Sequence, residues 1–201
     1  MELPMFPLGT VLVPHQLLPL QVFESRYRDL VEHCLATDRR FGVVLIERGS
    51  EVGGGDVRFD VGTVAQIGEY AQAPDGRYAL ATIGTDRFRV RKWLPDDPYP
   101  RAEVDVLTEP DLGADALVRR AAVVAGFDRV VELARALGAI VPAGLVLGDD
   151  PVRAGWEATA LAPIGPIDVL AILREDDPVL RLDRVVAALA DAAELLALQL
   201  P

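Results

Sequence analysis

The stretch that decides the fold is residues 3–23, LPMFPLGTVLVPHQLLPLQVF, which is followed at once by Glu24-Ser25-Arg26-Tyr27. Prolines recur in it every few residues, at positions 4, 7, 14 and 19. Each proline fixes φ, removes a backbone N–H donor and biases the preceding residue toward an extended conformation. A helix is therefore excluded, and the stretch predicts short extended segments with edge-strand character where a proline sits.

The remainder of the first half predicts more strands and one helix. The helix is expected at 24–37, where apolar residues recur at helical spacing. Strands are expected at 41–47, 60–70, 77–94 and 101–107. Because Pro74-Asp75-Gly76 is a turn signal between two of these strands, a hairpin is predicted there.

The second half predicts helices. Apolar residues recur at spacings of four and three from Val123 to Leu137, with Gly138 as a plausible stop. Asp150-Pro151 and Asp177-Pro178 each combine an acidic cap with a proline in the first turn, which is typical of helix starts, and Pro166 opens another helix. The expected fold class is α+β, with a β-rich subdomain at 1–107, a connector at 108–113 and a helical subdomain at 114–201.

Four segments together carry a family resemblance. They are the proline-rich entry, 61–67 (VGTVAQI), Pro74-Asp75-Gly76 with Gly84 and Arg87, and Arg181-Leu182 with Leu189. In this order they resemble the substrate-recognition (N-terminal) domain of the ATP-dependent Lon proteases, and the small stand-alone proteins related to it. The resemblance covers residues 3–200 and implies a PUA-like, partly closed β-barrel with one helix, followed by a C-terminal helical bundle. It also implies polypeptide recognition, in a chain of 201 residues that is too short to hold the Lon ATPase and peptidase as well.

Composition argues against several classes of protein. A net charge of −11 argues against a nucleic-acid binder, which normally has a basic face. The longest apolar run, 139–147, is broken by Pro142 and Gly144 and falls far below the roughly 20 residues that a membrane span needs. With no basic n-region at its start and with Cys34 alone, the chain is expected to be cytoplasmic. The oligomeric state is not predicted.

No catalytic or cofactor site can be assembled from the sequence. A serine–lysine dyad could use only Ser25, Ser50 and Lys92, and none of them lies in a peptidase-like motif. His15 and His33 lack the spacing of zinc ligands, and no phosphate-binding motif follows a predicted strand. We therefore expect a protein that is not an enzyme and that needs neither a cofactor nor a metal.

Two sets of residues are candidates for binding a partner. Large apolar rings supply most of the energy in protein contacts. The candidates are two leucines of the apolar entry segment and three aromatic residues: Leu17, Leu18, Tyr70, Trp93 and Tyr99. They favour a module that holds apolar segments of unfolded or partner polypeptides. A basic stripe for an acidic partner is the second candidate, formed by Arg87, Arg89 and Arg91, which alternate along one predicted strand. The stripe favours an adaptor for one folded protein, such as a protease or a regulator. For every one of these residues, core packing or a solvated sheet face is the alternative.

Overall fold

The computed structural model describes residues 1–49, 55–110 and 115–200. The chain folds into two compact units, Met1–Thr108 and Glu109–Pro201. A mixed six-stranded sheet and five helices make up the described chain, which confirms the predicted α+β class. Within the described residues, no helix is both long and apolar enough to cross a membrane.

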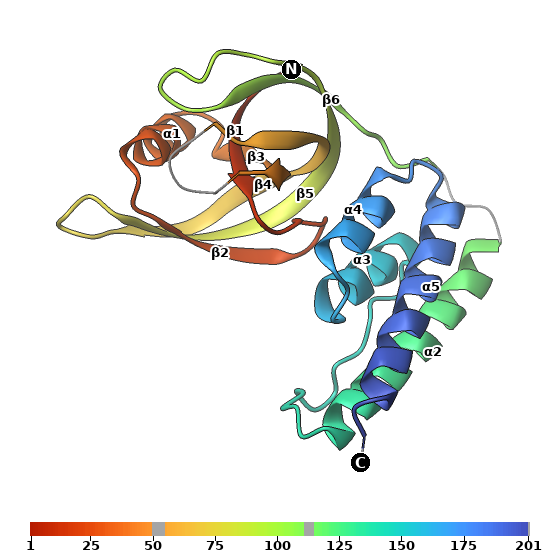
Figure 1. Cartoon of the computed structure of the whole chain (residues 1–201). Helices are drawn as coiled ribbons and strands as arrows, with labels where there is room; N and C mark the ends of the chain where they lie inside the picture. The colour runs from red at the N-terminus through yellow and green to blue at the C-terminus, as the bar shows by residue number, and fades with distance from the viewer. Residues whose placement is uncertain (50–54, 111–114, 201) are drawn as a thin grey trace. The chain divides into compact units, whose positions relative to one another are not determined.

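The first unit is a curled sheet with one helix. Its elements are β1 (Glu2–Leu8), β2 (Leu17–Val22), α1 (Ser25–Ala36), β3 (Arg40–Arg48), β4 (Val57–Gln72), β5 (Tyr78–Trp93) and β6 (Arg101–Val106). The strand order is β2-β5-β4-β3-β1-β6, and β5 also pairs with β6, so that β1, β3, β4, β5 and β6 form a ring of pairings (Figure 1). Only the β1–β3 pair is parallel among the described strands. Strand β2 is attached to this ring through β5 alone, as far as the described strands show.

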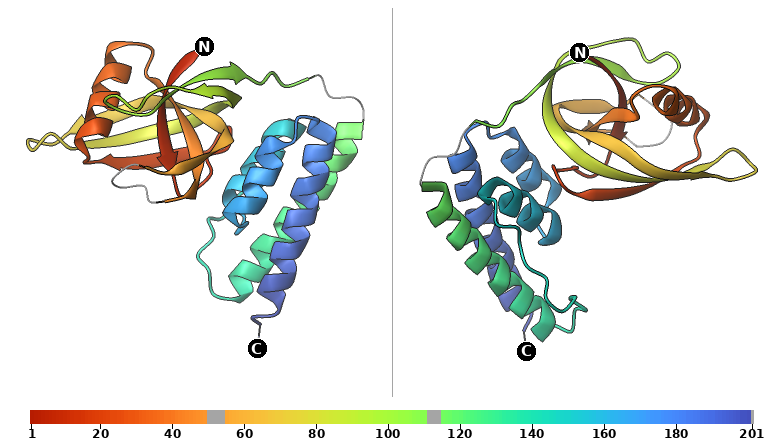
Figure 2. Two further views of the ribbon diagram at one scale, coloured as in Figure 1. Left: turned by 45° about the horizontal axis from the view of Figure 1, so that its top comes forward. Right: turned by 180° about the vertical axis from the view of Figure 1, so that it is seen from behind.

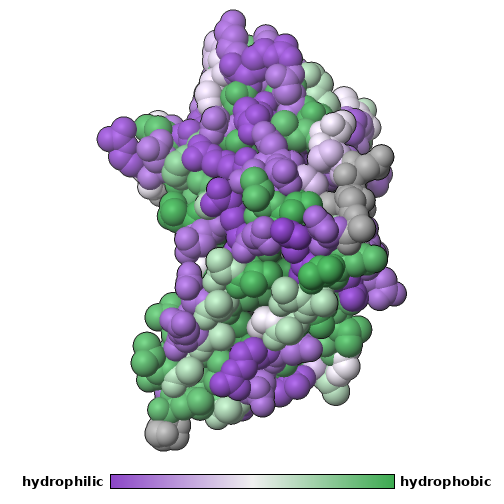
Figure 3. Space-filling view, turned by 90° about the vertical axis from the view of Figure 1, so that its right-hand side faces the viewer, coloured by the Kyte–Doolittle hydropathy of each residue, from purple (hydrophilic) through white to green (hydrophobic). Residues whose placement is uncertain are grey.

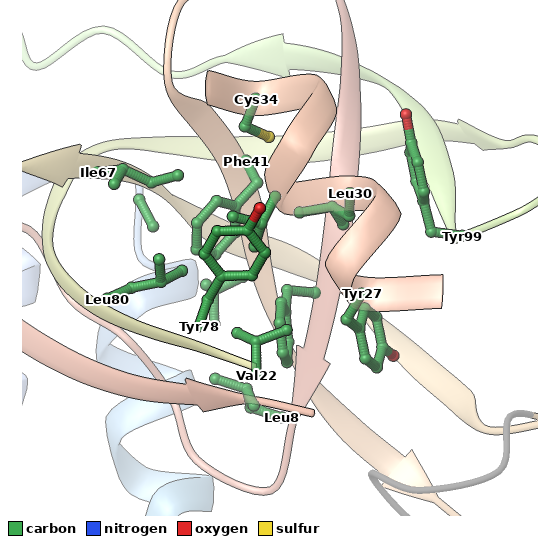
Figure 4. Packing of buried hydrophobic residues seen from close by; sticks show 14 of the residues in the cluster. Leu8, Val22, Tyr27, Leu30, Cys34, Phe41, Ile67, Tyr78, Leu80 and Tyr99 are labelled. Atoms are coloured by element: carbon green, nitrogen blue, oxygen red, sulfur yellow. The ribbon is translucent and has the colours of Figure 1, made fainter. Parts of the chain in front are cut away.

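The ring and α1 enclose the main apolar core of the first unit (Figure 4). Helix α1 buries the residues that its spacing predicted, Tyr27, Leu30, Val31 and Cys34. The Cys34 thiol donates to the carbonyl oxygen of Arg40 at 3.2 Å. Burial raises the pKa of this thiol to about 12, so it stays protonated and behaves as a small apolar side chain.

The second unit consists of four helices within the part of the chain that the structure describes. They are α2 (Asp115–Ala136), α3 (Pro151–Leu161), α4 (Pro166–Arg174) and α5 (Pro178–Ala197). The predicted caps are present, because the Asp150 carboxylate accepts from the N–H of Arg153 at 2.8 Å and the Asp177 carboxylate accepts from the N–H of Val179 at 2.8 Å. Helices α2 and α5 run side by side, and α3 packs on both (Figure 2).

Candidate functional site

Strand β2 is the part of the proline-rich entry that lies at the margin of the sheet. Its residues alternate in burial, because successive side chains of a strand point to opposite faces. Leu18 and Leu20 pack against the main core, whereas Leu17 is 73% exposed. The expectation that part of the entry runs along a sheet edge is confirmed, and of the two predicted leucines only Leu17 is widely accessible.

A pocket of about 210 Å³ opens beside β2. Its walls come from β1, β2 and the start of α1, and they are formed by Phe6, Leu8, Pro19, Leu20, Gln21, Val22, Phe23, Glu24 and Tyr27. Leu8, Val22 and Tyr27 lie beside one another near the ends of β1 and β2 (Figure 4). At its rim Phe23 is 56% exposed, so a large apolar ring is available to a partner without unfolding the sheet.

Two stacked aromatic rings line part of this pocket. Phe6 and Tyr27 lie with their ring centroids 4.2 Å apart and an angle of 14° between their planes. Burial raises the pKa of Tyr27 to about 12, so its hydroxyl is neutral at physiological pH. The lining carboxylate, Glu24, accepts a hydrogen bond from Arg26 at 3.3 Å. The pocket can therefore receive an apolar side chain, since its other walls are uncharged.

The predicted aromatic candidates are not gathered around this pocket. Tyr70 is 48% exposed on β4, with its ring 6.4 Å from that of Tyr78. Trp93 is half-buried against a second cluster of the sheet, and the Arg58 guanidinium lies 4.9 Å from its ring centroid. Tyr99 is only 7% exposed and belongs to the main core. Tyr99 is therefore not accessible to a partner, contrary to the prediction, because its ring packs in the core.

The three arginines of the predicted basic stripe do not share one exposed face. Arg87 is only 2% exposed, so it does not share a solvated face with Arg89 and Arg91. The reason is the segment between β1 and β2, which crosses this face of the sheet: the Thr63 hydroxyl, in register with Arg87, donates to the Leu12 carbonyl oxygen at 2.6 Å. Arg91 is exposed, and its Nε donates to the Asp105 carboxylate at 3.2 Å. The stripe thus reduces to two arginines that already have partners within the chain.

A second, more open cavity of about 470 Å³ lies around Arg58 and is lined by Gly55, Asp56, Val57, Arg58, Trp93 and Asp96. Arg58 donates to the Asp96 carboxylate at 2.6 Å and also pairs with Asp56. Burial alone would lower the pKa of Arg58, but the bonds to Asp96 and Asp56 outweigh it and raise that pKa. These ion pairs connect the start of β4 to the loop that follows β5. Among the described residues, no three His, Cys, Asp or Glu side chains converge as metal ligands.

Exposure by itself does not single out a site. One face of the molecule shows apolar side chains, in green, interspersed with polar ones, in purple (Figure 3). What distinguishes β2 is that an exposed leucine, a partly exposed phenylalanine and an apolar pocket occur along one sheet margin. Sequence reasoning selected Leu17 but missed Phe23, whose signal was its position at the end of the uncharged stretch, directly before the helix.

Comparison with known proteins agrees with this sheet and its proline-rich entry. Residues 2–191 match the family model described as the ATP-dependent protease La (LON) substrate-binding domain. The chain belongs to this family. It is 30% identical to Lon protease 2 of Herpetosiphon aurantiacus over 210 residues, covering 97% of this chain and 25% of that protein. It is 28% identical to Lon protease of Escherichia coli over 201 residues, again covering 97% of this chain and 25% of that protein.

Solved structures of the family have the same fold. The Lon N-terminal domain protein from Xanthomonas campestris superposes with a TM-score of 0.69 at 30% identity, covering 93% of this chain and 98% of that one. The N-terminal domain of a Mycobacterium avium complex Lon protease gives a TM-score of 0.65 at 15% identity, covering 95% of this chain and 99% of that one, which speaks for the fold alone. The predicted family resemblance is confirmed, and the chain spans about a quarter of the length of the two Lon proteases.

Proposed function

We propose that this protein is a non-catalytic polypeptide-binding module that holds apolar segments of other chains at the margin of β2. The observation that carries the proposal is the apolar pocket beside β2, with Leu17 and Phe23 exposed along the same margin. Burying a phenylalanine or leucine side chain contributes about 1.5–3 kcal/mol. Several such contacts, together with hydrogen bonds, are needed to offset the cost of association and reach micromolar affinity.

The family supports the proposal, because its model is described as a substrate-binding domain of an ATP-dependent protease. The matched region is the recognition part of such a protease and not its ATPase or peptidase part. Of the dyad candidates, Ser25 opens α1 and Lys92 lies on β5, while Ser50 falls outside the described residues. We infer that the chain by itself binds polypeptides and does not cleave them.

We also propose a partly closed barrel for the first unit and a helical bundle for the second. The ring of pairings supports a PUA-like, partly closed barrel, in which β2 forms one side of the opening. The packing of α2 against α3 and α5 supports a C-terminal bundle. We keep 1–107 and 114–201 as the two subdomains and 108–113 as their connector.

An adaptor that docks one folded acidic partner is the competing function. It has less support, because Arg87 is buried and Arg91 is paired with Asp105. With one arginine buried and another paired to a carboxylate, the basic stripe presents less net positive charge to such a partner.

The test is a fluorescence-anisotropy titration of a short labelled peptide of alternating leucine and threonine. Phe23→Ser and Leu17→Ser should each weaken binding by about tenfold, since each removes an apolar contact. Ile140→Ser is the matched control, because Ile140 is an apolar residue of the other unit with a fractional exposure of 101%. A wild type that binds no peptide would reject polypeptide binding, and equal binding by all variants would move the site away from β2.

A further inference from the structure

We propose that the bound polypeptide adds to the sheet as an extended strand along the open edge of β2. This inference rests on the proposed function and specifies how the site recognises its ligand. Strand addition uses main-chain hydrogen bonds for affinity and pockets for alternate side chains. Both components are present at this margin of the sheet.

Hydrogen bonds show which backbone groups of β2 face β5. The N–H of Gly84 donates to the Gln16 carbonyl oxygen at 2.9 Å, and the Thr82 hydroxyl donates to the Leu18 carbonyl oxygen at 2.7 Å. Even-numbered residues therefore direct their backbone groups toward β5, because these directions alternate in an antiparallel pair. Leu17, Pro19 and Gln21 direct theirs away from β5, and no strand of the described chain pairs along that edge.

Prolines leave the edges of β1 and β2 beside the pocket with more backbone hydrogen-bond acceptors than donors. Pro19 has no N–H to present on the open edge of β2. On β1 the N–H of Met5 donates to the Pro100 carbonyl oxygen at 2.8 Å, away from β3, so Pro7 two residues on also faces away from β3. Each edge is missing the N–H of its proline, so the two edges pair poorly with each other, but their carbonyl oxygens can accept from the N–H groups of an incoming strand.

The charge pattern identifies the occupant. From Leu3 to Phe23 the sequence has no Asp, Glu, Lys or Arg, although charged residues make up 25% of the chain. Exposed edges are commonly protected by charged side chains or by proline, and this edge has Pro19 but no charged side chain. An uncharged segment can align with it without desolvating a charge. The occupant is therefore an extended, uncharged stretch of polypeptide with an apolar side chain that enters the pocket between β1 and β2.

Amide hydrogen exchange followed by NMR tests the register directly, with the leucine–threonine peptide as the probe. In the free protein the amides of Leu17 and Gln21 should exchange fast, and those of Leu18, Leu20 and Val22 slowly. A saturating concentration of peptide should slow the hydrogen exchange of the Leu17 and Gln21 amides specifically. Binding that leaves these two amides unchanged would overturn strand addition while the proposed function stands, and absence of any binding would reject the proposed function itself.

A matched pair of variants gives a second readout. Gln21→Pro removes an N–H from the open edge and none from the β2–β5 ladder, so it should weaken peptide binding by about tenfold, the equivalent of one hydrogen bond. Gln21→Thr alters the same pocket-lining side chain but keeps the N–H, so it should bind the peptide more tightly than Gln21→Pro does. Equal binding by both variants would contradict the inference. A second copy of the protein could also pair along the open edge of β2. Analytical ultracentrifugation without peptide tests this, because such pairing would give concentration-dependent dimers. Dimers of this kind would overturn the assignment of the edge to a strand from another protein.

Discussion

At the scale of single residues, Arg181 on α5 shows how a charge is accommodated inside the second unit. Its side chain is buried and pairs with the Glu109 carboxylate, and its Nη1 donates to the Glu175 carbonyl oxygen at 2.9 Å. The guanidinium also lies 4.8 Å from the ring centroid of Trp156. The side chain of Glu109 is 35% exposed, so the cost of removing Arg181 comes mainly from the lost packing and hydrogen bonds of its buried guanidinium.

We predict that Arg181→Ala lowers the free energy of unfolding by about 2 kcal/mol, because packing against Trp156 and the hydrogen bond to Glu175 are lost; urea denaturation measures the change. The matched control is Arg184→Ala, since Arg184 pairs with Glu175 at 3.1 Å on the same helix but has a side chain that is 53% exposed. That exposed pair should contribute no more than about 1 kcal/mol. Similar losses in the two variants would show that burial of Arg181 adds nothing.

At the scale of secondary-structure elements, β4 has glycines in two different environments. A Cβ on Gly62 would lie 2.1 Å from the Val43 carbonyl oxygen and 2.7 Å from the Phe88 ring, because β3 and β5 both approach closely there. A Cβ on Gly68 would find only the Ala81 carbonyl oxygen among the described atoms, at 3.5 Å, which is an ordinary contact. The curled sheet therefore requires glycine at 62 and tolerates a side chain at 68.

Gly62→Ala should destabilise the protein by about 3 kcal/mol or more, since backbone atoms cannot move aside as a flexible side chain would. Gly68→Ala should change stability by less than about 1 kcal/mol and in the stabilising direction, because alanine restricts the unfolded chain. Thermal denaturation followed by circular dichroism compares the two variants. Equal melting temperatures would mean that β4 has room at Gly62 after all.

At the scale of the whole molecule, charge and binding are separated along the chain. The protein has a net charge of −11, yet the margin proposed for binding lies in a stretch without acidic or basic residues. Salt screens interactions between exposed charges and affects apolar contacts much less. The proposed function and the adaptor alternative therefore predict different responses to ionic strength.

Peptide affinity should change by less than about twofold between roughly 0.05 and 0.5 M salt, and binding should show a negative heat-capacity change. Arg91→Glu should bind the peptide as the wild type does, because its side chain is already paired with Asp105. Isothermal titration calorimetry at several temperatures measures both quantities. Affinity that falls steeply with salt, together with loss of binding in Arg91→Glu, would favour the adaptor for an acidic partner.

Local signals in the sequence identify most of the helices and strands. Proline spacing identified the extended entry, apolar periodicity identified α1, and the acidic caps at Asp150 and Asp177 marked helix starts. These signals are local, because φ restriction, capping and amphipathic spacing act within a few residues of the chain. The family could also be recognised from motifs, and its match over residues 2–191 confirms it.

Contacts between distant segments control which side chains remain accessible. Strand periodicity placed Arg87 with Arg89 and Arg91, but it could not reveal that the segment before β2 crosses that face and buries Arg87. In the same way, only packing against the main core removes Tyr99 from the surface, and only the approach of β1 to β2 forms a pocket next to Phe23. Burial depends on contacts between segments that are distant in sequence, and a local pattern carries no information about them.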